Sequence, residues 1–261
     1  MDHLQRTREE FTRQAAGFAA SAATTDQSHV ARLVEAIGDS ARRRVLDVAC
    51  GPGIVTAALA ERAQEVVALD VTPQMLEKAR ERCSKAGRIN VVFEEGSATA
   101  LPFGDACFDA VITRLSFHHF PEPRAALNEM LRVLRPAGTV AIADVVSAEE
   151  PDKSALQNAI EILRDPSHVR MLPATELIAM VAQSGVTIEW KETWDTPREF
   201  EEWVGIVANP ERVAPFRTVV RALAMAGEDA GMGLWLSDGG VVRFLHRWQL
   251  IVARKGSMPV E

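Results

Sequence analysis

The residues best suited to chemistry in this 261-residue chain surround a glycine-rich turn. The run VLDVACGPG, residues 45–53, carries an acid at Asp47 and then turns through Gly51 and Gly53. Glycine adopts backbone dihedrals that other residues avoid, and it lets a ligand approach the main chain closely. Asp70 follows at the end of the apolar run VVALD, where a carboxylate can accept hydrogen bonds from ribose hydroxyls. This spacing predicts a nucleoside-binding crevice.

Charge distinguishes the two nucleoside cofactors that such a crevice could hold. A dinucleotide places an anionic pyrophosphate on the helix N-terminus and uses a third glycine, but Thr56 stands at that position. Asp47 would repel a pyrophosphate, whereas it would attract the α-ammonium group of a methionine moiety. The charges therefore favour S-adenosylmethionine, and an NAD-dependent oxidoreductase is the alternative.

Short apolar runs rich in β-branched residues alternate with helical segments in the first part of the chain. We expect strands over 45–49, 66–69, 91–93, 108–113 and 140–146. We expect the intervening helices to begin near Ile54, Pro73 and Pro123. Strands of this composition, separated by helices, are typical of a parallel sheet covered on both faces.

Four motifs resemble, in order and spacing, those of class I S-adenosylmethionine-dependent methyltransferases. They are DVACGPG, the acid of VVALDVT, EEGSATALPFGDACFDAVI and LRVLRPAGTV. The chain is most similar to the small-molecule branch that includes ubiquinone and menaquinone biosynthesis methyltransferases, from about residue 30 to residue 146. The resemblance implies S-adenosyl-L-methionine as cofactor and an α/β, Rossmann-like, doubly wound sheet. That sheet would have seven strands, mostly parallel, with an antiparallel last strand.

The resemblance also implies how the C-terminal part completes the sheet. VTIEW, residues 186–190, would be the sixth strand, and VVRFLHRWQLIVA, residues 241–253, would be the last strand, inserted beside it. Helices expected between Pro197 and Ala226 would then form a helical cap over the substrate side.

Cofactor-binding residues are carried over from the family's motifs. Besides Asp47, Gly51, Gly53 and Asp70, the set comprises Cys50, Val71, Ser97, Ala98, Arg114 and Leu115. Ser97 stands where the family commonly has an aspartate, so it can bond the adenine amine only without a charge. Cys50 is expected to be a small filler rather than a reactive thiol. The Arg114 side chain is expected either to meet a carboxylate or to be solvated.

Three residues are candidates for chemistry on the methyl acceptor. Methyl transfer from a sulfonium is a direct displacement, and positioning alone can supply roughly 7–11 kcal/mol of the barrier. A base is needed only if the acceptor must lose a proton, a role for which His118 and His119 are suited at neutral pH. Packing and backbone capping are the alternative for both histidines. Asp144 is expected to orient a substrate or to form an ion pair within the cap.

Composition narrows the class of partner. With a net charge of −7, the chain has little attraction for nucleic acid or for an anionic membrane. Its three cysteines form no CxxC pair, which predicts no metal site and fits a reducing, cytoplasmic environment. The expected partner is a small-molecule substrate whose O, N or C acceptor is open. A homodimer is allowed, and a catalytically silent, S-adenosylmethionine-binding regulatory protein is a further alternative.

We divide the chain into four segments. Residues 1–29 form an N-terminal extension in which Phe11 and Phe18 share one side of a helix, as either a lid or a loosely held terminus. Residues 30–148 form the cofactor-binding core, residues 149–240 form a helical cap with the sixth strand, and residues 241–261 form the last core strand and a tail.

Overall fold

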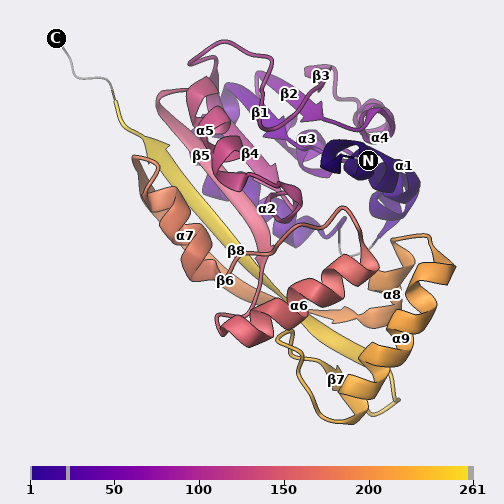
Figure 1. The fold of residues 1–261 in the computed structure, drawn as a ribbon. Helices are drawn as coiled ribbons and strands as arrows, with labels where there is room; N and C mark the ends of the chain where they lie inside the picture. The colour runs from indigo at the N-terminus through magenta and orange to yellow at the C-terminus, as the bar shows by residue number, and fades with distance from the viewer. Residues whose placement is uncertain (1, 22–23, 258–261) are drawn as a thin grey trace.

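A computed structural model describes residues 2–21 and 24–257. In these ranges one mixed sheet runs through the molecule, and helices cover both of its faces (Figure 1). The strands are β1 (Arg44–Val48), β2 (Glu65–Asp70), β3 (Val91–Glu95), β4 (Phe108–Arg114), β5 (Leu134–Val146), β6 (Val186–Glu199), β7 (Trp235–Leu236) and β8 (Val242–Lys255). Their order is β3-β2-β1-β4-β5-β8-β6, and β7 pairs with β8 off this path.

The helices connect these strands in the expected alternation. They are α1 (His3–Ala20), α2 (Gln27–Ala36), α3 (Ile54–Leu59), α4 (Pro73–Lys85), α5 (Pro123–Val133), α6 (Pro151–Arg164), α7 (Ala174–Ala182), α8 (Phe200–Gly205) and α9 (Pro210–Met225), with short 3₁₀ turns η1 (Gly38–Arg42) and η2 (Phe117–His119). The three predicted helix starts, at Ile54, Pro73 and Pro123, are confirmed.

Burial on both faces explains why the central strands are almost entirely apolar. One cluster joins Leu46 and Val111 to Leu127 of α5 and Leu177 of α7. A second cluster, on the other face, joins Val45 and its neighbours to helices α2 and α3. The parallel strands β1 to β5 therefore need apolar residues in both directions, as a doubly wound fold requires.

Strand order places the ligand-binding edge. β1 pairs in parallel with both β2 and β4, so the order of connection reverses on the two sides of β1. Ligands of open α/β sheets bind beyond the carboxyl ends of the strands at such a reversal. The predicted position of the last strand is also confirmed, because β8 lies between β5 and β6 and is antiparallel to both.

The C-terminal part differs from the prediction in two respects. β6 continues well past VTIEW to Glu199, so the expected helical segment begins only at Phe200 and is divided into α8 and α9. Pro197 is tolerated within β6 because β6 is an edge strand. A residue there whose backbone N–H would face away from the sheet has no neighbouring strand to donate to, so proline loses no hydrogen bond. The small strand β7 is an eighth strand that was not predicted.

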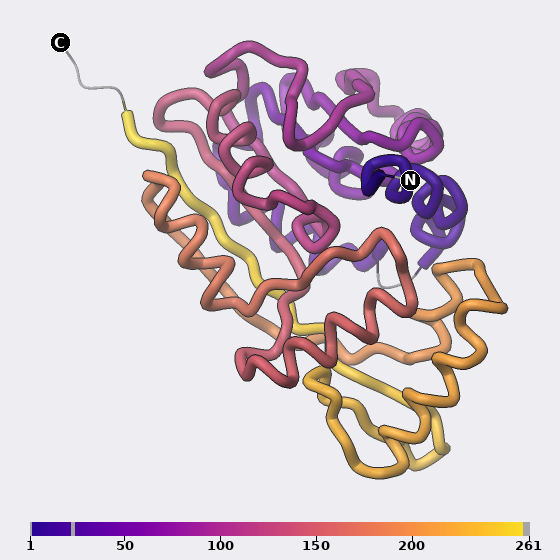
Figure 2. Tube along the Cα trace, in the orientation of Figure 1, coloured from indigo at the N-terminus to yellow at the C-terminus, as the bar shows by residue number. Residues whose placement is uncertain are grey.

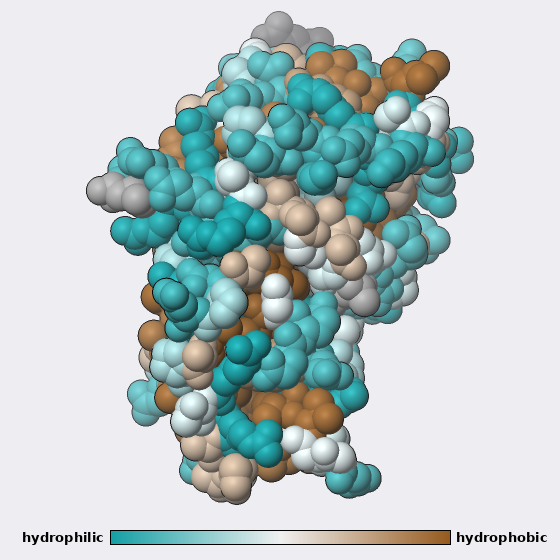
Figure 3. All heavy atoms as spheres, turned by 90° about the vertical axis from the view of Figure 1, so that its right-hand side faces the viewer, coloured by the Kyte–Doolittle hydropathy of each residue, from teal (hydrophilic) through white to brown (hydrophobic). Residues whose placement is uncertain are grey.

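β6 and β8 extend together beyond the central sheet. Figure 2 shows β8 running from this extension back to the sheet. The extension carries a core of its own, in which Trp203 of α8, Phe216 of α9 and Phe244 of β8 are buried together. Hydrophilic side chains dominate the face that carries α1, α8 and α9, with apolar ones gathered in its middle and lower parts (Figure 3).

The N-terminal helix packs along α4 at the ligand-binding edge. Phe11 and Phe18 do share one side of α1, with ring centroids 5.7 Å apart. Residues 1, 22 and 23 of the predicted extension, and 258–261 of the predicted tail, lie outside the described residues. None of the helices in the described ranges is long and apolar enough to cross a bilayer.

Candidate active site

A cavity of about 270 Å³ lies at the carboxyl ends of β1, β2 and β4. This volume is near the lower end of the roughly 300–1,000 Å³ typical of small-ligand pockets. Ten of the predicted site residues line it: Asp47, Cys50, Gly51, Asp70, Val71, Ser97, Ala98, Arg114, Leu115 and His119. Gly53, His118 and Asp144 are not part of the described wall.

The two glycines of the turn meet different demands. Both have positive φ, +53° at Gly51 and +73° at Gly53. A Cβ on Gly51 would have no neighbour within 4 Å, so this residue leaves the backbone open for a ligand. A Cβ on Gly53 would lie 2.7 Å from the Cβ of Ala79 in α4. Gly53 was predicted to contact the cofactor, but the structure places it against α4, where it permits close helix packing.

We expect Gly53→Ala to destabilise the fold by about 2–4 kcal/mol, because left-handed strain adds to a clash with the α4 backbone. Gly51→Ala is the matched control, since its φ is similarly positive but no atom is crowded; it should cost about 1 kcal/mol. Urea unfolding of both variants measures the difference. Equal losses of stability would contradict the packing role of Gly53.

Asp70 holds the glycine turn through both carboxylate oxygens. Its Oδ2 accepts the amide of Gly51 at 2.9 Å, and its Oδ1 accepts the amide of Thr72 at 2.8 Å. Burial raises the pKa of Asp70, and these amide hydrogen bonds oppose that rise. A carboxylate in this position can still accept ribose hydroxyls, because each oxygen has a second lone pair.

Asp47 is hydrogen-bonded to Thr56, the residue that stands where a dinucleotide motif would have its third glycine. The Thr56 hydroxyl donates to Asp47 Oδ2 at 2.6 Å, and both side chains are buried. Burial raises the pKa of Asp47 to about 7, although the hydrogen bond from Thr56 opposes this shift. Asp47 is therefore a carboxyl that a nearby cation would readily ionise.

Arg114 is a half-buried cation, and its guanidinium uses little of its hydrogen-bonding capacity. Its Nη1 donates to the carbonyl of Thr24 at 3.0 Å, and its guanidinium lies 5.3 Å from the Trp248 ring centroid. Its Nε and Nη2 are buried without a partner among the described residues. Burial lowers the pKa of Arg114 to about 10, while the charges of Asp47, Asp26 and Asp144 oppose that shift. Two nitrogens of the guanidinium are shielded from solvent, and their free donors suit a carboxylate.

Four other predicted cofactor residues, Val71, Ser97, Ala98 and Leu115, also belong to the wall. Leu115 has a φ of +55°, which is strained for a leucine, and Ala49, a wall residue at the end of β1, has the same value. The carbonyl of Val71 accepts Arg8 of α1, and the Ser97 hydroxyl is within 3.0 Å of the Thr99 hydroxyl. Ala98 is buried.

Cys50 carries no sign of reactivity. Burial, first of all, and the neighbouring carboxylates raise the pKa of its thiol well above the usual value. The protonated thiol is a poor nucleophile, so the expectation of a small filler agrees with its surroundings. No group of three metal-binding side chains was found among the described residues.

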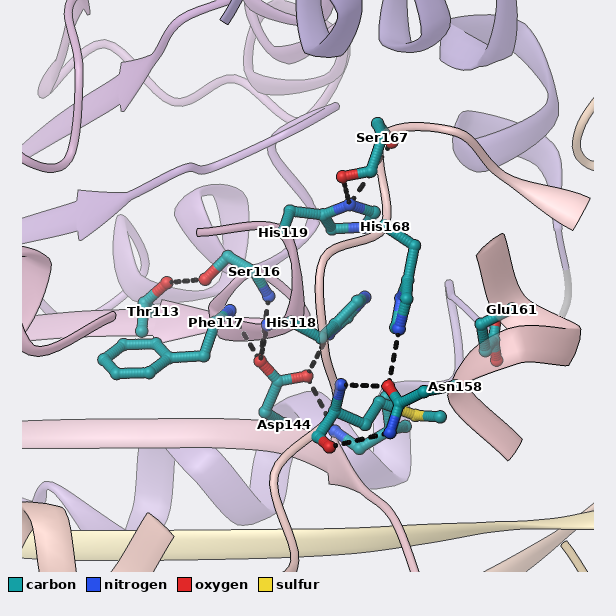
Figure 4. Close-up of polar contacts among 12 residues, drawn as sticks. Thr113, Ser116, Phe117, His118, His119, Asp144, Asn158, Glu161, Ser167 and His168 are labelled. Carbon is teal, nitrogen blue, oxygen red and sulfur yellow. Dashed lines mark hydrogen bonds and ion pairs between the residues drawn. The ribbon is translucent and has the colours of Figure 1, made fainter. Parts of the chain in front are cut away.

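The adjacent histidines lie in different surroundings (Figure 4). His118 Nδ1 is 2.6 Å from Asp144 Oδ1, and neither side chain belongs to the cavity wall. Asp144 Oδ2 also accepts the amides of Ser116 at 3.2 Å and Phe117 at 2.6 Å. Asp144 therefore holds the η2 turn instead of facing a substrate. Burial opposes ionisation of His118, but Asp144 outweighs it, so the pKa of His118 is raised.

His119 belongs to the cavity wall. Its Nδ1 faces the carbonyl oxygen of Ser167, 3.0 Å away, in the loop between α6 and α7. Its ring meets the ring of Phe11 edge to face, with centroids 4.8 Å apart. Of the three predicted catalytic residues, His119 alone is placed to contact a molecule in the cavity.

Part of the wall comes from α1, which motif analysis did not assign to the site. His3, Leu4, Thr7, Phe11 and Phe18 all line the cavity. Arg8 of α1 bonds the carbonyl of Val71, and Gln14 bonds Asp165 beyond α6. Two alternatives were given for the N-terminal extension, a lid or a loosely held terminus. Its described part lies against the cavity, where a lid would lie. The sequence carried one signal for this, the pair of phenylalanines on one helix side.

Comparison with known proteins gives a consistent result. The model of a family described as "Methyltransferase domain" matches residues 46–142. The chain is 34% identical over 164 residues to "Uncharacterized methyltransferase YcgJ" of Bacillus subtilis, covering 63% of this chain and 65% of that protein. It therefore spans just under two thirds of this relative in sequence. It is 33% identical over 159 residues to "Uncharacterized protein YafE" of Escherichia coli, covering 61% of this chain and 77% of that protein.

One further relative carries a named activity, and the solved structure of YcgJ allows a comparison in three dimensions. "Demethylmenaquinone methyltransferase" of Deinococcus radiodurans is 44% identical over 114 residues, 43% of this chain and 46% of its own length. The crystal structure of the Bacillus YcgJ protein superimposes with a TM-score of 0.80 at 28% identity, covering 89% of this chain and all of that one.

Proposed function

Because the chain belongs to the class I methyltransferase family, we propose that it transfers a methyl group from S-adenosylmethionine to a small, largely apolar metabolite. One observation carries the choice of donor: a carboxyl, a carboxylate and a guanidinium with two unpartnered nitrogens line one cavity. Asp47 suits an ammonium group, Asp70 suits ribose hydroxyls, and Arg114 suits a carboxylate. A nucleoside joined to an amino acid has all three groups.

The residues present fit this cofactor. Arg114 has two buried nitrogens without partners, and a ligand carboxylate would satisfy donors that otherwise cost free energy. Gly51 leaves open space where a side chain would stand. Asp47, Asp70 and Arg114 would therefore hold the methionine and ribose parts, with Ser97 and Ala98 beside the adenine.

The chain's own contribution is alignment and exclusion of water. When bound, S-adenosylmethionine supplies an electrophilic methyl group on a sulfonium. Phe11 and Phe18 from α1, with Phe120 after η2, give the remaining wall an apolar surface that suits a flat or aliphatic acceptor. A cavity of this kind holds two reactants in fixed register, which is the main requirement for a direct displacement.

Calorimetric titration tests the proposal. S-adenosylhomocysteine should bind, and NAD should not, because Asp47 opposes a pyrophosphate at the turn. Binding of S-adenosylhomocysteine should also release protons. The pKa of Asp47 is about 7 in the free protein, so at pH 6 about nine tenths of this carboxyl is protonated. A bound ammonium group favours the carboxylate and lowers that pKa, so affinity should rise as the pH rises from 5 to 7.

Titrations in buffers of different ionisation enthalpy measure the released protons. Asp47→Asn is the matched variant, because it keeps the shape of the side chain and removes its titration. Proton release near pH 6 should fall sharply in this variant. Binding of NAD alone would reject the proposed donor, and proton release unchanged in Asp47→Asn would reject the ammonium contact.

A further inference from the structure

The orientation of His119 is set by a loop of the helical cap. Its Nδ1 faces two oxygens of Ser167, the carbonyl at 3.0 Å and the hydroxyl at 3.2 Å (Figure 4). The Ser167 hydroxyl donates its own proton to Asp165 Oδ1 at 2.6 Å. Both Ser167 oxygens therefore act as acceptors toward the ring, and Nδ1 must carry the imidazole proton.

This tautomer leaves the other ring nitrogen as an acceptor. No described residue forms a hydrogen bond with His119 Nε2, although the ring is part of the cavity wall. Its neighbour His118 differs, because that ring is engaged by Asp144 and is not part of the wall.

Asp165 is itself held in its ionised, accepting form. It receives the Ser167 amide at 2.9 Å and, from the N-terminal helix, the Gln14 side-chain amide at 3.1 Å. Burial opposes ionisation, but the charge of Arg164 and the hydrogen bonds from Ser167 favour the carboxylate, and the pKa of Asp165 is lowered. The chain Gln14–Asp165–Ser167 thus links the lid helix to the ring of His119.

The charged groups around His119 keep it neutral. Burial and the charge of His118, whose ring centroid is 4.2 Å away, lower the pKa of His119 to about 3. Asp165, the hydrogen bond to Ser167 and Asp144 act in the opposite direction but do not outweigh burial. Over the physiological pH range the ring therefore offers a lone pair at Nε2.

The rest of the wall restricts the charge of the acceptor. Among the described wall residues there is no lysine, and Arg114 carries the one guanidinium. Arg114 is assigned to the cofactor carboxylate, so an anionic acceptor would meet the His119 lone pair without a compensating cation. An aliphatic ammonium group held against Phe11 and Phe18 would lose its hydration, and Glu122, the wall carboxylate not assigned to the cofactor, is exposed to solvent and does not replace it. An uncharged aromatic or enolic hydroxyl meets neither penalty.

We propose that His119 Nε2 accepts the proton of an uncharged aromatic or enolic hydroxyl as that oxygen is methylated, and that Asp165 and Ser167 are the positioning residues that aim it. This inference rests on the proposed function. The acceptor oxygen uses a lone pair to form the new O–CH₃ bond, the sulfur keeps the electron pair of the broken S–CH₃ bond, and the hydroxyl proton passes to Nε2. The positive charge moves from sulfonium to imidazolium.

A weakly basic imidazole is sufficient for this step. As the oxygen bonds to the methyl group it gains positive charge, and its proton becomes strongly acidic. The transfer can therefore follow bond formation closely without a strong base. Since His119 stays neutral, the rate should show no acidic limb between pH 6 and 7 from this residue.

Nitrogen-15 NMR of histidine-labelled protein tests the positioning without any ligand. The His119 ring, assigned by the signals missing in His119→Phe, should carry its proton on Nδ1 from pH 5 to 8. Ser167→Ala is the matched variant, since it keeps the carbonyl acceptor and should keep this tautomer. Asp165→Ala removes the acceptor of the Ser167 hydroxyl, which is then free to donate to Nδ1, so a population protonated on Nε2 should appear. Asp165→Asn is the control, since its Oδ1 can still accept the hydroxyl, and it should keep the wild-type tautomer. A wild-type ring protonated on Nε2 would overturn the proposal, and so would an unchanged tautomer in Asp165→Ala.

Binding to the protein saturated with S-adenosylhomocysteine tests the acceptor class. We expect 2-naphthol to bind at least tenfold more tightly than 2-naphthoate, which shares its ring but is anionic. His119→Phe should weaken 2-naphthol binding about threefold to tenfold, the effect of one lost hydrogen bond, and leave S-adenosylhomocysteine affinity unchanged. Equal or reversed preference, or no binding of either compound at millimolar concentration, overturns the acceptor class. Failure of S-adenosylhomocysteine itself to bind would instead reject the proposed function, and the tautomer measurement would still judge the positioning.

Discussion

Asp70→Ala should weaken the binding of S-adenosylhomocysteine about 100-fold, or by about 2.7 kcal/mol. The carboxylate is expected to accept the ribose hydroxyls while it holds the Gly51 and Thr72 amides from its two oxygens. Alanine removes the ligand contact and also releases the turn that shapes the cavity. Isothermal titration calorimetry measures the loss of affinity.

Two further variants separate these effects. Asp39→Ala removes the same charge from an exposed carboxyl, 95% accessible in its side chain, and should leave the affinity unchanged. Asp70→Asn keeps one acceptor oxygen and so can satisfy one of the two amides; its affinity should fall between wild type and Asp70→Ala. An Asp70→Ala affinity within threefold of wild type would show that the carboxylate does not contact the ribose.

Arg114→Met should change stability and cofactor affinity in opposite directions. The guanidinium is buried, and two of its nitrogens have no partner among the described residues, so it weakens the free protein. Replacing such a cation with an apolar side chain of similar length should stabilise the free protein by about 1–2 kcal/mol. The same change removes the partner of the ligand carboxylate and should weaken S-adenosylhomocysteine binding about 10-fold to 100-fold. Urea unfolding and calorimetry measure the two effects.

The conservative variant Arg114→Lys serves as the control. Lysine keeps the charge but cannot present the planar pair of donors that suits a carboxylate, so its affinity should be intermediate. Two outcomes would contradict the assignment. Unchanged affinity in Arg114→Met would remove the carboxylate contact, and a clear loss of stability would mean that the contacts with Thr24 and Trp248 make Arg114 structural.

The central sheet could be predicted because its signals are local. Apolar, β-branched runs mark β1, β2 and β4, and a proline at the first helical position marks the starts of α4 and α5. The end of β6 could not be predicted in the same way. Pro197 and its neighbours read as a helix start, but pairing with β8 extends the strand to Glu199.

Most of the residues that the motifs assigned to a cofactor line one cavity. Asp47, Gly51 and Asp70 line the cavity because they lie at or just after the carboxyl ends of β1 and β2, which parallel pairing brings to one edge. Gly53 shares the motif but contacts Ala79, a residue of α4 that no motif near the turn indicates. In the sequence, Thr56 indicated only that the third glycine of a dinucleotide motif is absent. The hydrogen bond from its hydroxyl to Asp47 is visible only in the fold.

The sequence by itself determined the fold class and where the glycine turn lies, because strand patterns and a glycine turn act over short separations. Only the tertiary structure decided what surrounds the acceptor. His118 and His119 are neighbours of the same type, and nothing local distinguishes them. Asp144 binds the His118 ring, which lies outside the cavity wall. Ser167, 48 residues after His119, orients the His119 ring within the wall. Such contacts depend on how α1 and the cap pack onto the sheet, which local propensity does not encode.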